Sequence, residues 1–423
     1  MLPHRPTLFQ ANTVMNRFSS LTLLGLLLVS TSLQAARLTY RYDSAGRLTA
    51  VNYDGESRTA YGYDPNGALV SRVDSVTPDA APPPHLAGVY QGRITNATPE
   101  AANSGILTLN LLASGAFTGK FIVGGVTVTF KGSFLADGSA APIVLNGKPP
   151  FTGLTLTLDL LAAAPRITGT LAADGFDSDV MAEQALFNAK TNPLPAGWIG
   201  KYTALFAPTE AGAGIPQGDG YGLVTVKNTG GLTLAGRLAD NTAFTHGSLI
   251  VGDGSWPLFV LLYKKTGLLS AQVAFVTDPG ISDFAGTADW RKPETPGPFH
   301  SGAFTTELDF FGARYTPPAT GQRALAVAEG PENLQLTASG GGLDEDPYER
   351  LLTLDAKNKL LVPVDASGLK LGLVSASGLF TGSFKDDGIV RPVSGVLLQS
   401  LNVGAGFFSG SFEGGPVDLV PAP

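Results

Sequence analysis

Short runs of alternating apolar and polar residues recur along most of this chain, and they constrain its fold more than any other feature. They follow one another at intervals of about 8–14 residues, with Gly, Asn, Asp or Pro between them. Examples are residues 106–112, 126–134, 154–160, 232–238, 258–263, 268–276 and 369–374. Alternation places successive side chains on opposite faces of a strand. Short strands at this spacing predict an all-β fold of antiparallel barrels or sandwiches.

A glycine-centred segment is repeated within these runs. Gly-Ala-Phe-Thr-Gly-Lys-Phe at residues 115–121 returns in related form at residues 378–384 and 406–412. The central glycines of the three copies are Gly119, Gly382 and Gly410. In a strand each glycine shares one face with the phenylalanines two residues away, although glycine weakens a strand interior. We expect these glycines to bend the sheet toward closure and to leave room for a neighbouring aromatic ring.

Larger blocks are also visible. Gly88-Val-Tyr90 and Gly200-Lys-Tyr202 open similar stretches, and proline-rich segments separate the blocks. We expect about seven or eight strands in each block, a usual number for a small barrel or sandwich. The pattern is compatible with separate barrels and with one larger barrel. The predicted blocks are residues 88–193, 194–293 and 294–423.

The first 36 residues have the pattern of a secretory leader. Arg17 precedes the apolar run Leu21–Val29, and small residues follow it. The run is much shorter than the ~20 residues that span a bilayer. The start is Met1 or Met15, and the alternative to a leader is a buried apolar segment of the mature protein. We predict an exported protein, extracellular, periplasmic or at the cell surface, with no integral membrane span after the leader is removed.

Two related segments follow the predicted leader. Residues 40–48 and 61–69 both read Tyr-x-Tyr-Asp-x-x-Gly-x-Leu. Tyrosines two residues apart lie on one face of a strand, and Asp followed by Gly three residues later suits a turn. Each copy therefore predicts a β-hairpin within residues 37–75. The motif residues are Tyr40, Tyr42, Asp43, Gly46, Tyr61, Tyr63, Asp64 and Gly67.

These two segments resemble the YD repeats of RHS-type bacterial surface and toxin proteins. The resemblance covers about 35 residues, and Ala68 departs from the Arg47 of the first copy. It implies hairpins of the kind that build a closed shell in large RHS proteins. Two hairpins enclose nothing, and isolated hairpins are marginal in water, so a toxin-encapsulating role is not carried over. Residues 76–87 are rich in proline and predict a linker.

Composition excludes several kinds of chemistry. The chain has no Cys, which excludes disulfides and thiolate metal sites or nucleophiles. Its net charge is −7, and no basic patch suits the phosphates of nucleic acid. No Gly-x-Ser-x-Gly elbow occurs. The acidic loop Asp344–Asp346 could hold calcium but lacks EF-hand spacing.

The four histidines of the chain are the remaining candidates for metal binding or catalysis. None has another histidine or a carboxylate at metal-ligand spacing, and each reads as a surface or loop residue. They are His4, His85, His246 and His300. We therefore predict no catalytic, cofactor-binding or metal-binding residue.

These features predict a secreted or cell-surface, non-enzymatic β-repeat protein with a structural, adhesion or interaction role. A surface glycan or another envelope protein is the kind of partner we expect. The alternatives are a β-barrel that binds a glycan or lipid in its mouth, an outer-membrane barrel, and an uncharacterised hydrolase. A barrel interior filled by Phe and Leu would count against the first alternative. Expected strands of about 6–8 residues, shorter than the ~9–11 that cross a bilayer, count against the second.

Overall fold

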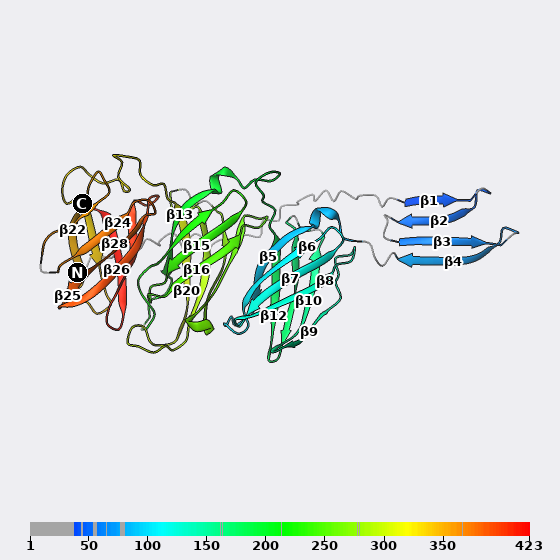
Figure 1. Ribbon diagram of the computed structural model, residues 1–423, viewed down its shortest axis with the longest axis horizontal. Helices are drawn as coiled ribbons and strands as arrows, with labels where there is room; N and C mark the ends of the chain where they lie inside the picture. Colours follow the sequence, from blue (N-terminus) through cyan, green and yellow to red (C-terminus); the bar gives the residue numbers. More distant parts are fainter. Residues whose placement is uncertain are drawn as a thin grey trace, which may run out of the picture. The chain divides into compact units, whose positions relative to one another are not determined.

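The computed structural model describes residues 38–423 apart from 44, 54–56, 65, 77–80, 161, 163, 213, 277, 279 and 366. The predicted leader lies outside these residues. The chain divides into two units, Met1–Thr77 and Pro78–Pro423. Both are built from antiparallel strands, as predicted (Figure 1). Within the described residues, no helix has the length and hydrophobicity that a membrane crossing requires.

The first unit contains one four-stranded sheet in the order β1-β2-β3-β4. The two predicted hairpins are confirmed and join through pairing of β2 with β3. Leu48 and Leu69 are the first residues of the two return strands, as the motif predicts. The strands are β1 (Leu38–Tyr42), β2 (Leu48–Tyr53), β3 (Ser57–Tyr63) and β4 (Leu69–Val76).

The second unit contains three eight-stranded antiparallel sheets, each rolled into a nearly closed barrel (Figure 1). The first comprises β5 (Gly88–Thr95), β6 (Gly105–Leu111), β7 (Ala116–Val123), β8 (Val126–Ser133), β9 (Ile143–Lys148), β10 (Phe151–Asp159), β11 (Arg166–Ala173) and β12 (Phe176–Gln184). The second comprises β13 (Gly200–Pro208), β14 (Gly220–Val226), β15 (Gly231–Arg237), β16 (Ala243–Leu249), β17 (Ser255–Leu262), β18 (Gly267–Ala274), β19 (Phe284–Lys292) and β20 (Phe304–Arg314). The third comprises β21 (Leu334–Ala338), β22 (Tyr348–Leu354), β23 (Leu360–Leu361), β24 (Lys370–Val374), β25 (Leu379–Asp386), β26 (Ile389–Leu398), β27 (Val403–Ser409) and β28 (Gly414–Pro421).

One topology is used three times. The first and last strands of each barrel pair with each other, and the remaining strands follow in sequence order. The ladder is interrupted at one seam in each barrel. This seam lies between the fourth and fifth strands of the first two barrels, and between the short third strand and the fourth in the last. The internal repeats therefore correspond to separate barrels, the first of the two arrangements that the pattern allowed.

The boundary predicted between residues 293 and 294 differs from the topology. β20 lies beyond it, yet pairs with both β13 and β19 and so completes the second barrel. The proline-rich segment at residues 293–298 lies in the connection between β19 and β20, within that barrel. The boundary between residues 193 and 194 does fall between barrels, because β12 ends at Gln184 and β13 begins at Gly200.

Packed apolar side chains fill the interior of each barrel. In the second barrel, the rings of Phe206 and Phe310 stack with centroids 4.1 Å apart. Trp256 packs edge-on against Phe310 at 5.9 Å. The other two barrels have similar Leu-rich and Phe-rich cores. Aromatic burial of this kind dominates the energetics of a core.

The predicted glycine sites are used in different ways. Gly119 faces inward on β7, directly opposite Phe130, and a Cβ at this position would overlap the Phe130 ring. Gly382 is central in β25, where a Cβ would collide with the carbonyl oxygen of Lys370 on β24. Gly410 differs from the prediction because β27 ends at Ser409, so this glycine lies in a turn. The repeat continues in sequence beyond the end of the strand.

Candidate functional site

The tyrosine-motif residues build turns in the first unit. Asp43 Oδ1 accepts the backbone N–H groups of Ala45 and Arg47, each at 2.9 Å, and Gly46 has φ +76°. Asp64 repeats this arrangement, and Gly67 has φ +85°. Hydrogen bonds from Arg47 hold the pKa of Asp43 below its ordinary value.

The tyrosines of the two motifs differ in exposure. Tyr40 and Tyr42 are 52% and 61% exposed. Tyr61 and Tyr63 are half-buried. The Tyr63 hydroxyl donates to the carbonyl oxygen of Leu48 at 2.9 Å. The motif residues thus shape the hairpins and gather no catalytic or metal-binding set.

The histidines lie apart from one another. His246 Nε2 donates to the carbonyl oxygen of Pro257 at 2.9 Å, and burial lowers the pKa of His246. His300 Nε2 accepts the N–H of Gly414 at 3.2 Å, and burial lowers its pKa as well. His85 lies exposed in the short helix η1 (Pro84–Leu86). In the described residues, no group of three or more His, Asp or Glu could hold a metal ion.

The acidic loop Asp344–Asp346 is engaged by one arginine, Arg350, and by a neighbouring aspartate, Asp386. Arg350 pairs with Glu345 at 2.9 Å. Asp386 accepts the N–H of Asp344 at 3.0 Å and pairs with the buried Arg391 at 2.9 Å. These contacts give the loop a structural role.

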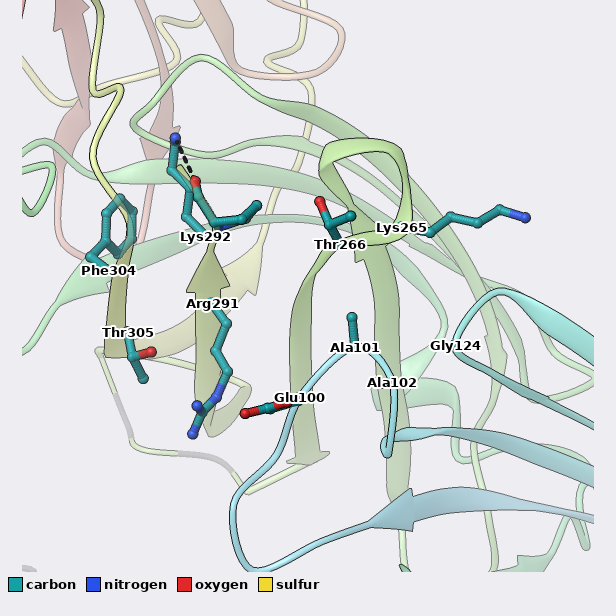
Figure 2. A pocket seen from close by; sticks show the side chains of 11 residues that line it. Glu100, Ala101, Ala102, Gly124, Lys265, Thr266, Arg291, Lys292, Phe304 and Thr305 are labelled. Atoms are coloured by element: carbon teal, nitrogen blue, oxygen red, sulfur yellow. Dashed lines mark hydrogen bonds between the residues drawn. The ribbon is translucent and has the colours of Figure 1, made fainter. Parts of the chain in front are cut away.

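A basic pocket lies where a loop of the first barrel meets the second barrel (Figure 2). Its volume is about 410 Å³, within the range of small-ligand sites. It lies outside the barrel interiors. The residues that line it are Glu100, Ala101, Ala102, Gly124, Lys265, Thr266, Arg291, Lys292, Pro293, Phe304 and Thr305.

One wall of the pocket begins at a left-handed turn. Helix η3 (Tyr263–Lys265) has φ values of +49°, +56° and +77° at Tyr263, Lys264 and Lys265. Left-handed backbone costs ~1–2 kcal/mol per residue without glycine. Such strain persists only when surrounding contacts hold it, and it is concentrated at functional sites.

Buried polar groups hold this turn on the side of the second barrel. The Tyr263 hydroxyl donates to Asp240 Oδ2 at 2.6 Å and accepts the indole N–H of Trp290 at 2.9 Å. Burial, together with the Asp240 carboxylate, raises the pKa of Tyr263. On the other side, Lys265 Nζ donates to the carbonyl oxygen of Gly125 at 3.2 Å, in the β7–β8 turn of the first barrel.

Positive charge dominates the lining. Lys265, Arg291 and Lys292 face one acid, Glu100. Lys292 is buried and its Nζ donates to Thr295 Oγ1 at 2.6 Å; burial lowers its pKa. Arg291 Nε is buried and has no hydrogen-bond partner among the described residues. The pocket therefore offers a guanidinium that an anion could engage.

The sequence did not predict the pocket, because its residues are far apart along the chain. The adjacent pairs Lys264-Lys265 and Arg291-Lys292 were the available signal. Neither pair forms a basic cluster until the chain has folded. The fold and the pocket define an all-β protein of repeated eight-stranded barrels that presents its pocket outside the barrels.

Comparison with known proteins assigns one short segment. Residues 42–78 match the RHS repeat family, which confirms the resemblance at the tyrosine motifs; the rest of the chain remains unassigned. No curated protein matches the sequence.

Three solved structures show weak likeness to the chain. A mutant of Transferrin Binding Protein B from Haemophilus parasuis Hp5 has 11% identity and a TM-score of 0.19, covering 91% of this chain and 84% of its own. The isotype 1 protein of that name from serogroup B Neisseria meningitidis has 10% identity and a TM-score of 0.18, covering 91% and 88%. A DUF3598 family protein of unknown function from Nostoc punctiforme has 14% identity and a TM-score of 0.16, covering 54% and 96%. TM-scores this low carry no argument about what the present chain binds or does.

Proposed function

We propose that this chain is an exported, non-enzymatic protein of the cell surface or envelope that acts by binding other molecules on the outside of its barrels. The observation that carries the proposal is the filled interior of each barrel. A ligand has no room where Phe, Leu and Trp side chains pack together. This argues against a glycan or lipid held inside a barrel mouth and favours the outer surface.

The buried polar groups also support a binding role without catalysis. Asp240 and Tyr263 brace the left-handed turn. Asp386 and Arg391 neutralise each other. Their partners are structural, and the tyrosine motifs are likewise used in turns. The predicted leader and the RHS repeat match at residues 42–78 support export.

Fractionation of cells that produce the full chain tests the export half of this proposal. We expect the protein outside the cytoplasm, with a mass that corresponds to an N-terminus near Arg37. Leu24→Arg interrupts the predicted apolar run and should leave unprocessed protein in the cytoplasm. Leu2→Arg lies outside the run and should not change export. Wild-type protein found in the cytoplasm with its N-terminus intact would contradict the proposal.

A further inference from the structure

The arginine of the basic pocket is placed to receive a ligand. Arg291 lies on the outer face of β19, between Trp290 and Lys292, whose side chains are buried. Its Nε has neither water-exposed surface nor a hydrogen-bond partner among the described residues. A guanidinium binds a carboxylate through two parallel N–H···O bonds. Because the buried Nε is closed to a ligand, the terminal N–H groups of the Arg291 guanidinium, which line the pocket (Figure 2), are the donors for one oxyanion group.

The rest of the lining adds groups that complement hydroxyls. Glu100 extends toward the same end of the pocket as Arg291 (Figure 2). Its carboxylate can only accept hydrogen bonds, so a ligand beside it must carry donors. Thr305 contributes a hydroxyl and Phe304 an aromatic ring, whereas the Thr266 hydroxyl donates to the carbonyl oxygen of Tyr263 at 2.6 Å and can only accept from a ligand. An anion without hydroxyl groups would leave Glu100 facing it with like charge.

The loop that carries Glu100 is held in place before any ligand binds. The N–H of Glu100 donates to Asn103 Oδ1 at 2.8 Å, and Asn103 Nδ2 donates to the carbonyl oxygen of Thr98 at 2.9 Å. The N–H of Gly124 donates to the carbonyl oxygen of Ala101 at 3.0 Å. A preformed wall lowers the entropy cost of binding.

We propose that the pocket binds a sugar acid, with its carboxylate on Arg291 and its hydroxyls beside Glu100 and the threonines. Lys265 and Lys292 strengthen the attraction through their charge. The cavity of about 410 Å³ accommodates one such ring. This inference adds a ligand to the proposed binding role and rests on it, whereas export is measured separately by fractionation. Failure of one therefore does not imply failure of the other.

Calorimetric or NMR titration of the purified chain tests the inference. The probes are glucuronate and galacturonate, with neutral glucose and galactose and inorganic sulfate as comparisons. We expect a uronate to bind, and to bind more weakly as salt is added, since the charged groups are partly exposed. Sulfate or a neutral sugar that binds as tightly as the uronates would overturn the assignment, as would no uronate binding up to about 10 mM.

Variants locate the binding. Arg291→Gln should weaken uronate affinity about tenfold or more, the usual effect of losing a charge-assisted hydrogen bond. Lys265→Gln should weaken it about threefold, since it removes a nearby charge together with the hydrogen bond to the carbonyl oxygen of Gly125. The matched controls are Arg237→Gln, on β15 and outside the pocket lining, and Lys264→Gln, the exposed neighbour of Lys265. Melting curves check that each variant folds. Unchanged affinity in Arg291→Gln would overturn the proposal.

Discussion

In each barrel, phenylalanine rings cover glycines that lie directly opposite on the next strand. Phe117 covers Gly132 in the first barrel, Phe284 covers Gly312 in the second and Phe380 covers Gly395 in the third. The ring occupies the space that a Cβ would fill, so the position of the ring requires glycine on the facing strand. Glycine is usually unfavourable in a strand, but here a larger residue would displace a buried aromatic ring.

Gly119→Val should destabilise the first barrel, although valine is the better strand residue. The new side chain would overlap the Phe130 ring, and overpacking costs ~1–3 kcal/mol. Thr118→Val is the matched control, because Thr118 faces outward on the same strand; it should leave stability nearly unchanged. Denaturant unfolding measures both variants. Equal stability of Gly119→Val and wild type would show that the ring does not need this glycine.

The ion pair between Asp386 and Arg391 is the most deeply buried one in the described residues, at 4% and 5% exposure. Burial alone would raise the pKa of Asp386, but hydrogen bonds from Arg391 and from two backbone N–H groups hold it below its ordinary value. Arg391→Leu leaves this carboxylate without its cationic partner and should cost ~3–5 kcal/mol. Urea unfolding at neutral pH measures the loss.

Acid supplies a second test of this pair. Because the folded pKa of Asp386 is lowered, its stabilisation is present above the ordinary pKa of 3.8 and is lost as the pH falls through the lower folded value. Arg391→Leu should therefore differ least from wild type in strong acid. Arg166→Leu breaks the exposed pair with Asp159 and should cost no more than ~1 kcal/mol. Similar losses of stability in Arg391→Leu and Arg166→Leu would refute the idea that burial makes the Asp386–Arg391 pair more important than an exposed pair.

At the scale of elements, the left-handed turn η3 (Tyr263–Lys265) connects the two walls of the basic pocket. Its hydrogen bonds reach Asp240 in the second barrel and Gly125 in the first. Gly125 has φ +74°, and a Cβ there would collide with the Lys265 side chain. The turn therefore fits closely against the first barrel, and its backbone strain is balanced by contacts on both sides.

Lys264→Gly should stabilise the protein by about 1 kcal/mol. Lys264 is exposed, and its φ of +56° suits glycine better than any residue with a Cβ. Lys131→Gly is the control, since Lys131 is exposed in the middle of β8; there glycine should destabilise by ~0.5–1 kcal/mol. Thermal unfolding measures whether each variant gains or loses stability relative to wild type. A loss of stability in Lys264→Gly would mean that its side chain makes a contact that outweighs the backbone strain.

Much of the molecule could be predicted from sequence because strand alternation and turn residues are local signals. Leu48 and Leu69 begin their strands where the motif places them. The boundary predicted at residue 293 was wrong, because a proline-rich connection between two strands of one barrel has the same composition as a linker between barrels. The pocket could not be predicted, because Glu100 and Arg291 meet only after two barrels have formed.

At the scale of the whole molecule, an acid pair lies where the first barrel contacts the second. The N–H of Gly252 donates to the carbonyl oxygen of Gln184 at 2.9 Å. Their neighbours Asp253 and Glu183 are thereby brought together, and Glu183 Oε2 is buried with no hydrogen-bond partner in the described part of the chain. Burial, followed by the charge of Asp253, raises the pKa of Glu183 to about 7. The charge of Arg166 opposes this shift only weakly.

Stability should therefore fall as the pH rises from about 5 through 7. The folded state keeps a proton on Glu183 that the unfolded state releases near its ordinary pKa of 4.5, so stabilisation is full below 4.5 and is lost as the pH passes the folded pKa. Because the Glu183 side chain is only half-buried, solvent screening limits the effect to about 1–2 kcal/mol. Thermal melts of wild type and Glu183→Gln between pH 5 and 8 measure it. Glu183→Gln should lack this dependence of stability on pH. Glu349→Gln, on β22 of the third barrel, should keep it. The same pH dependence in Glu183→Gln would show that another group titrates.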